Sequence, residues 1–180
     1  MTEGLMRYIP IMFDVLVFVY ENYRQGDVCP DPPQLSRRLT AAGFETDEIE
    51  SAIIWLNGLN TAAQSTQIYL PGTFNCLTDA ATPRHEQQSS TPDSLRVYSI
   101  SEQEHLGASA LGFISFLHTS NILSAQMREI VIDRAMVSPG GPLELDDLKI
   151  IVLMVYWSFG QEPDALVLDE LCDAANRIGH

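Results

Sequence analysis

Residues 144–157 read ELDDLKIIVLMVYW, and this stretch decides the fold. Acidic side chains at the start of a helix complement the positive end of the helix dipole. The apolar run behind the acids is too continuous for a surface helix, which keeps one polar face. We therefore expect a helix over 145–159 that is buried on all sides in an all-α protein.

Apolar residues at helical spacing predict further helices on both sides of this stretch. The expected ranges are 9–23, 33–42, 47–56, 101–117, 124–137 and a last helix that begins at Pro163. Gly43 should end the second helix in the left-handed conformation, and Thr46 is placed to cap the third. Residues 101–104 read SEQE, which has the form of a capping box. In the last helix, Leu166, Leu168 and Leu171 should hold the helix against the bundle.

The composition divides the chain into two small helical modules. Residues 1–60 form an N-terminal three-helix module and residues 94–180 a C-terminal helical bundle. Between them, residues 61–93 are dominated by Ala, Thr, Ser, Gln and Pro, which bury too little apolar surface to offset the entropy of ordering. We expect a flexible linker there, in which the apolar group at 68–74 allows a short docked strand or turn.

The chain is strongly acidic, with 24 Asp and Glu against 10 Lys and Arg among 180 residues and a formal net charge of −14. Nucleic-acid affinity comes largely from Lys and Arg that neutralise phosphates. Direct binding to nucleic acid or to anionic lipid is therefore disfavoured.

Cysteine usage and apolar run lengths indicate a soluble cytoplasmic protein. Cys29, Cys76 and Cys172 are widely spaced and form no Cys-x-x-Cys pair, which argues against a disulfide framework or a zinc site. The N-terminus lacks the cationic start of a secretion signal. The longest apolar runs, 15–20 and 150–157, fall well short of the ~20 residues of a membrane span.

Several segments in order along the chain resemble the bacterial Smg family. They are MFDVL at 12–16, AGF at 42–44 with WL at 55–56, RVYS at 96–99, REIVIDR at 128–134, and LELDDLK at 143–149 with VLMV at 152–155. The similarity covers nearly the whole chain, and the last segment is the most specific. The family is largely uncharacterised, so the resemblance implies no catalytic residue, binding residue or cofactor.

The sequence contains no constellation that specifies a reaction. Ser109 lies between Gly107 and Gly112, but this spacing misses the Gly-x-Ser-x-Gly elbow by one residue and lies in a helical pattern. The four histidines, at 85, 105, 118 and 180, form no metal-helix pair. Asp146 and Asp147 are adjacent and point about 100° apart on a helix, which favours helix-start and surface roles. We predict no catalytic, cofactor or metal site.

Four residues are candidates for an interaction surface. Gly43 and Phe44, with the helix that follows them, resemble the Gly-Phe corner of ubiquitin-associated-like modules, which bind proteins there. Arg128 and Arg134 are basic residues in an acidic chain. Arg134 could pair with Asp146 or Asp147 across two helices, or it could bind a partner.

These features favour a protein-interaction adaptor or regulator without catalytic activity, whose protein partner is unknown. The alternative is a nucleic-acid-associated factor that uses the N-terminal helices as a helix-turn-helix-like unit. Charge weighs against this alternative, because the expected helix at 47–56 has no basic side chain to offer to phosphates or bases. A third alternative is an enzyme that its sequence motifs do not reveal.

Overall fold

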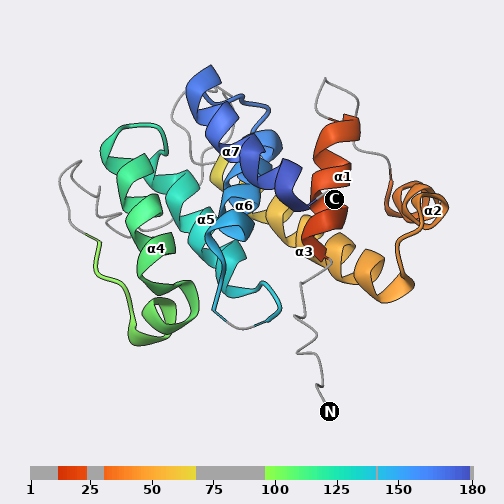
Figure 1. Cartoon of the computed structure of the whole chain (residues 1–180), viewed down its shortest axis with the longest axis horizontal. Coiled ribbons are helices and arrows are strands. Elements are labelled where there is room, and N and C mark those ends of the chain that lie inside the picture. Colours follow the sequence, from red (N-terminus) through yellow and green to blue (C-terminus); the bar gives the residue numbers. More distant parts are fainter. Residues whose placement is uncertain (1–11, 24–30, 68–95, 141, 179–180) are drawn as a thin grey trace, which may run out of the picture.

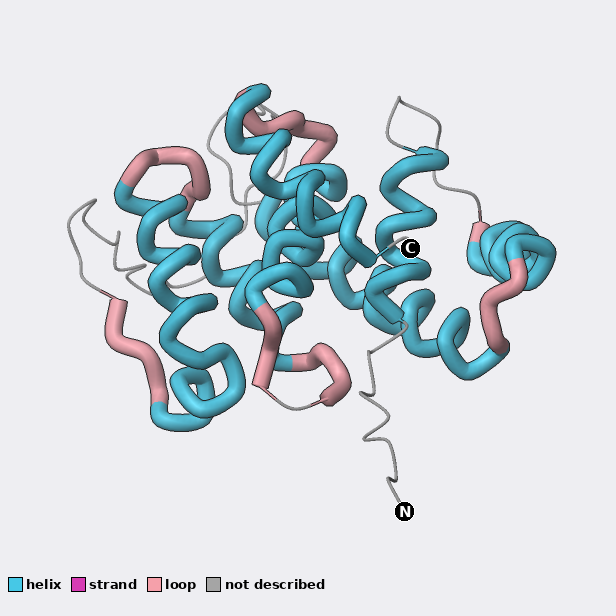
Figure 2. Tube along the Cα trace, viewed as in Figure 1, coloured by secondary structure: helices cyan, strands magenta, loops and turns pink. Residues whose placement is uncertain are grey.

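The computed structural model describes residues 12–23, 31–67, 96–140 and 142–178. Within these ranges the chain is all-α, as predicted, and contains no strand (Figures 1 and 2). The helices are α1 (Met12–Tyr23), α2 (Pro32–Ala42), α3 (Thr46–Gln67), α4 (Ile100–Thr119), α5 (Ala125–Met136), α6 (Leu145–Ser158) and α7 (Ala165–Ile178).

Helix α6 is the centre of the core. Its residues from Leu148 to Tyr156 are all buried, as the apolar run predicts. It packs against α1, α3, α4, α5 and α7, while α2 and α4 lie at opposite ends of the long axis of the molecule (Figure 1). The helix contacts neighbours on every side, which is why its sequence shows no polar face.

Both halves of the chain contribute to one hydrophobic cluster. Phe13 and Leu16 of α1 and Trp55 of α3 belong to the same cluster as Val131 of α5 and Val152 of α6. Direct packing of α1 and α3 on α6 accounts for this shared core. The division into two modules therefore stays a prediction from composition.

Helix α3 is longer than the sequence pattern predicts. It continues to Gln67, so residues 61–67 are helical, whereas we expected the linker to begin there. Ala63 is buried, and the hydroxyls of Thr61 and Ser65 donate to the carbonyls four residues earlier. These bonds satisfy the hydroxyls inside the helix, while buried Ala63 packs this last part of α3 against the fold, which composition alone does not show. The rest of the predicted linker, 68–93 with its apolar group, lies outside the described residues.

Most predicted helix ends are confirmed, with small shifts of register. Gly43 has φ of 102° and ends α2 in the left-handed region, and the Ser124 side chain caps α5. The capping box exists but uses Ser99 with Glu102, two residues before the predicted Ser101. Thr46 lies inside α3 and does not precede it.

The last helix begins later than predicted, and fewer of its predicted leucines pack against the bundle. It starts at Ala165, and the Asp164 carboxylate accepts a hydrogen bond from the Leu166 amide. Leu171 is fully buried and Leu168 packs against the core, but Leu166 is 81% exposed. The prediction for Leu166 is wrong because the first turn of α7 points it away from the bundle.

Candidate interaction groove

Gly43 and Phe44 form a closed corner between α2 and α3. The Phe44 amide donates to the Leu39 carbonyl over 3.2 Å, which completes the cap of α2. The Phe44 ring is half-buried and meets the Phe18 ring of α1 edge-on, with 5.7 Å between centroids. Phe44 therefore attaches the corner to α1, and only part of its ring remains open to a partner.

The two arginines of α5 are engaged in different places. Arg128 pairs with Glu129 over 2.9 Å. Arg134 pairs with Asp133 over 2.7 Å, so the predicted pairing with Asp146 or Asp147 is wrong. The four predicted interaction residues thus do not converge on one site.

Arg134 instead joins α5 to α3. A Cβ atom built on Gly58 would lie 1.9 Å from Nη1 of Arg134, so the guanidinium occupies the space where another residue would carry its side chain. The Trp55 indole N–H donates to the Arg134 carbonyl over 3.1 Å. This close approach places the Arg134 guanidinium against α3.

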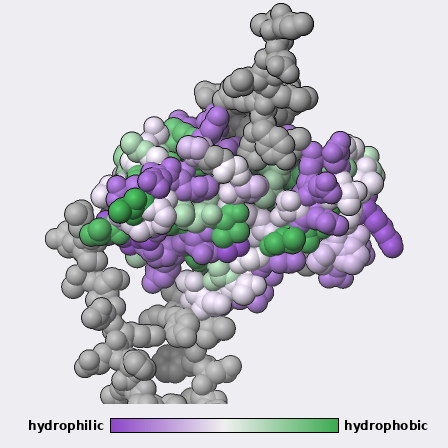
Figure 3. All heavy atoms as spheres, turned by 90° about the horizontal axis from the view of Figure 1, so that it is seen from below, coloured by the Kyte–Doolittle hydropathy of each residue, from purple (hydrophilic) through white to green (hydrophobic). Residues whose placement is uncertain are grey.

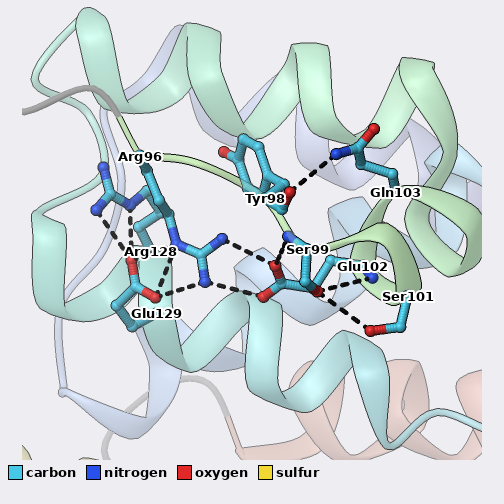
Figure 4. A network of polar contacts seen from close by, with 8 residues as sticks. All are labelled: Arg96, Tyr98, Ser99, Ser101, Glu102, Gln103, Arg128 and Glu129. Atoms are coloured by element: carbon cyan, nitrogen blue, oxygen red, sulfur yellow. Dashed lines mark hydrogen bonds and ion pairs between the residues drawn. The ribbon is translucent and has the colours of Figure 1, made fainter.

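Arg128 belongs to a charged network around Arg96 (Figure 4). The Arg96 guanidinium contacts Glu102 and Glu129, each over 2.9 Å, and lies 4.8 Å from the centre of the Tyr98 ring. Hydrogen bonds from Arg96 and from the Ser99 amide lower the pKa of Glu102 to about 2. The network holds the segment before α4 against α4 and α5, which is a structural role.

A groove of about 330 Å³ opens between α2, α3 and the end of α6. Its apolar wall is formed by Leu35, Ile53, Leu56, Leu59 and Trp157, with Pro32 at the edge. Its polar lining consists of Asp31, Asn57, Asn60 and Ser158. Sequence reasoning missed this groove because its residues come from three helices that only the fold brings together.

One wall of the groove is held in place by a hydrogen bond, and one exposed acid lines the groove. The Trp157 indole N–H donates to the Tyr23 carbonyl over 3.2 Å, which fixes the orientation of the ring. At the mouth, Asp31 is exposed, and its side chain makes no capping bond to α2. Such a site can accept an apolar side chain flanked by a positive charge. Its lining holds no nucleophile paired with a base.

Two acids lie at the start of α1 and α6. Asp147 is only 9% exposed, so the surface role expected for it is wrong, although it does lie in the first turn of α6. Burial, with smaller effects from Glu144, Asp146 and Asp14, raises the pKa of Asp147 to about 6. Burial and the charge of Glu48 raise the pKa of Asp14. Among the described residues, no donor reaches the buried Oδ1 atom of Asp14.

The histidines of α4 have structural contacts. His105 shares a hydrogen bond of 3.1 Å with the Ala135 carbonyl, and His118 one of 3.0 Å with the Leu123 carbonyl. In the part of the chain that the structure describes, no group of three or more His, Cys, Asp or Glu residues could hold a metal ion. No helix there has the length and apolar composition needed to cross a membrane.

The described residues form an all-α protein with a partly apolar groove between α2, α3 and α6. The face shown in Figure 3 is mostly hydrophilic, with small separate hydrophobic areas. The family model described as "Protein of unknown function (DUF494)" matches residues 12–180, and the chain belongs to this family.

Curated relatives carry the description "Protein Smg homolog" and agree with the resemblance seen in the sequence. The relative from Methylibium petroleiphilum is 55% identical over 170 residues, which cover 94% of this chain and all of the relative. Those from Leptothrix cholodnii and Herminiimonas arsenicoxydans are 53% and 43% identical, over 94% of this chain and all of each relative. No solved structure gives a significant match.

Proposed function

We propose that this chain is a cytoplasmic protein-interaction adaptor or regulator that acts by binding and not by catalysis. The observation that carries this proposal is the groove between α2, α3 and α6, which combines apolar lining residues with one acid, Asp31, and the amides Asn57 and Asn60. Pockets of this size hold one or two large side chains, which suits the anchor residues of a partner helix.

The residues that line the groove indicate which kind of partner segment it would bind. Leu56 and Trp157 offer apolar surface to a Leu, Met or aromatic anchor, and aromatic walls contribute strongly to such contacts. Asp31 at the mouth and the net charge of −14 favour a partner segment that also carries Lys or Arg. We therefore expect an amphipathic helix with bulky apolar anchors and a basic flank.

Charge speaks against the nucleic-acid alternative. Asp47 and Glu50 are exposed in the first turns of α3, and exposed Glu45 directly precedes the helix, so this surface would repel phosphates. Among the residues that the structure describes, no contact or cavity favours that alternative over protein binding.

The test compares two substitutions of equal charge on α3. Asn57→Arg places a cation and extra bulk in the groove, whereas Ser65→Arg puts the same side chain at an exposed position outside it. A partner isolated from a bacterial lysate, treated with nuclease and washed at raised salt, is purified and titrated against each variant by calorimetry. We expect Asn57→Arg to weaken binding at least tenfold and Ser65→Arg to leave it unchanged.

Two results would contradict the proposal. Equal binding by both variants would place the partner elsewhere on the surface. A partner that is retained only while nucleic acid is present would favour the nucleic-acid alternative, because phosphate contacts are sensitive to salt.

A further inference from the structure

The lining of the groove between α2, α3 and α6 carries charge of one sign. Asp31 is the acid among the lining residues, and none of the others is a Lys, Arg or His. Asp31 is exposed, and the ion pairs of the described residues do not use it. The groove therefore offers a ligand a negative charge that its own lining does not balance.

Two helix ends border the groove, and their effects nearly cancel. Helix α2 begins at Pro32, and the start of a helix carries about half a positive charge. Helix α6 ends at Ser158, and the end of a helix carries about half a negative charge. The Asp31 carboxylate carries a full charge, so it decides that the groove attracts cations.

The fold uses several of the hydrogen-bond donors near Asp31 for its own contacts. Prolines occupy the first two positions of α2 and have no N–H, and the amides of Gln34 and Leu35 donate to the Asp31 carbonyl over 2.8 and 3.0 Å. The Ser158 hydroxyl donates to the Val155 carbonyl over 2.7 Å. The carboxylate of Asp31 and the hydroxyl oxygen of Ser158 remain as acceptors, which favours a ligand rich in donors.

The mixed lining favours a guanidinium over an ammonium group. Leu35, Leu56 and Trp157 line the same groove as the acceptors, so a bound cation gives up part of its water. An ammonium group is compact and strongly hydrated, whereas a guanidinium is planar, more weakly hydrated and carries five N–H donors. A guanidinium therefore loses less on entering the groove, and its flat face packs well on apolar or aromatic surface.

We propose that the groove recognises an arginine of the partner segment together with a bulky apolar residue. The guanidinium pairs with the Asp31 carboxylate, and the apolar side chain packs against Leu56 and Trp157. On a helical partner the two residues are three or four positions apart, since residues at that spacing share one face of a helix. This inference rests on the proposed function, because it takes the groove as the place where the partner binds.

The experiment uses the full chain and three small probes that share one apolar part. Phenylethylguanidinium, phenylethylammonium and the neutral phenylethylurea differ only in the head group. Binding is followed by NMR through the indole N–H signals of the two tryptophans. Trp157 lines the groove, whereas Trp55 is 2% exposed and does not line it, so Trp55 is an internal control.

We expect the guanidinium probe to shift the Trp157 signal and to bind more tightly than the other two probes. At low salt its advantage over the urea should be about fivefold, or about 1 kcal/mol, the upper range for an exposed ion pair. Asp31→Asn should remove this advantage. Asp47→Asn, which neutralises an exposed acid of α3 outside the groove, should keep it.

Each contrary result identifies what is wrong. Equal binding of guanidinium and urea would overturn the arginine inference, but the groove would remain an apolar site and the proposed function would stand. Equal binding of guanidinium and ammonium would refute the preference for arginine over lysine. A guanidinium preference that survives in Asp31→Asn would contradict the role of Asp31.

Absence of a Trp157 shift with every probe would also overturn the inference. The proposed function is then judged separately, by the comparison of Asn57→Arg with Ser65→Arg against the isolated partner.

Discussion

Two charged regions of this molecule shift the pKa of a carboxyl group in opposite directions. At the start of α4, Arg96 supplies hydrogen bonds to Glu102, and the pKa of Glu102 falls to about 2. At the start of α6, burial and acidic neighbours raise the pKa of Asp147 to about 6. Both acids lie in the first turn of a helix, so the helix dipole does not explain the difference. Burial at Asp147 and the hydrogen bonds from Arg96 at Glu102 together explain why one acid strains the fold and the other stabilises it.

The largest effect should come from an acid placed where neither solvent nor a cation is available. Val152 is fully buried at the centre of α6. Val152→Asp removes burial worth about 1.5–3 kcal/mol and adds an unpaired charge, so we expect it to unfold the bundle. Circular dichroism and thermal melting check this, with Val97→Asp as the control because Val97 is 85% exposed. Native helicity and melting in Val152→Asp would contradict our placement of α6.

Removal of Arg96 should leave Glu102 at the start of α4 without this cation, which makes it more like Asp147 at the start of α6. Arg96→Met keeps much of the side-chain length but leaves Glu102 and Glu129 without this partner. We expect a loss of about 2 kcal/mol in the free energy of unfolding, because hydrogen bonds to charged groups contribute more than neutral ones. Denaturant midpoints measure the loss, and Arg37→Met on the exposed side of α2 should show little.

The two regions should also give opposite limbs in the pH profile of stability. The low pKa of Glu102 means that its stabilisation is complete above pH 4.5 and is lost as the pH falls toward about 2. Glu102→Gln should therefore cost about 1–2 kcal/mol at pH 6 and much less at pH 2.5. A cost that is the same at both pH values would show that packing, and not charge, explains the effect of Glu102.

The smallest effect concerns Arg134, whose charge has a partner but whose position depends on a glycine. Gly58→Ala should push the guanidinium aside and cost about 1 kcal/mol, since the end of a flexible side chain can move. In a double-mutant cycle with Arg134→Met, the cost of Gly58→Ala should shrink. Equal costs in both backgrounds would mean that Arg134 does not fill the space over Gly58.

The candidate sites were less predictable than the helices. The buried state of Asp147 and the position of Arg134 depend on neighbours from α1 and α3, which lie far away in sequence. The groove likewise needs Leu35, Leu56 and Trp157 from three helices at once. Periodicity reports which face of a helix is apolar, but it does not report which helix covers that face.

The sequence by itself determined the all-α class, the central place of α6 and the caps at Gly43 and Ser124, because these depend on residues adjacent in the chain. Tertiary structure alone decided that Arg96 reaches Glu129, that Lys149 reaches Glu170 and that Asp147 is buried. Electrostatic energy depends on distance and on exclusion of water, and both quantities exist only once α1, α3 and α6 have packed together.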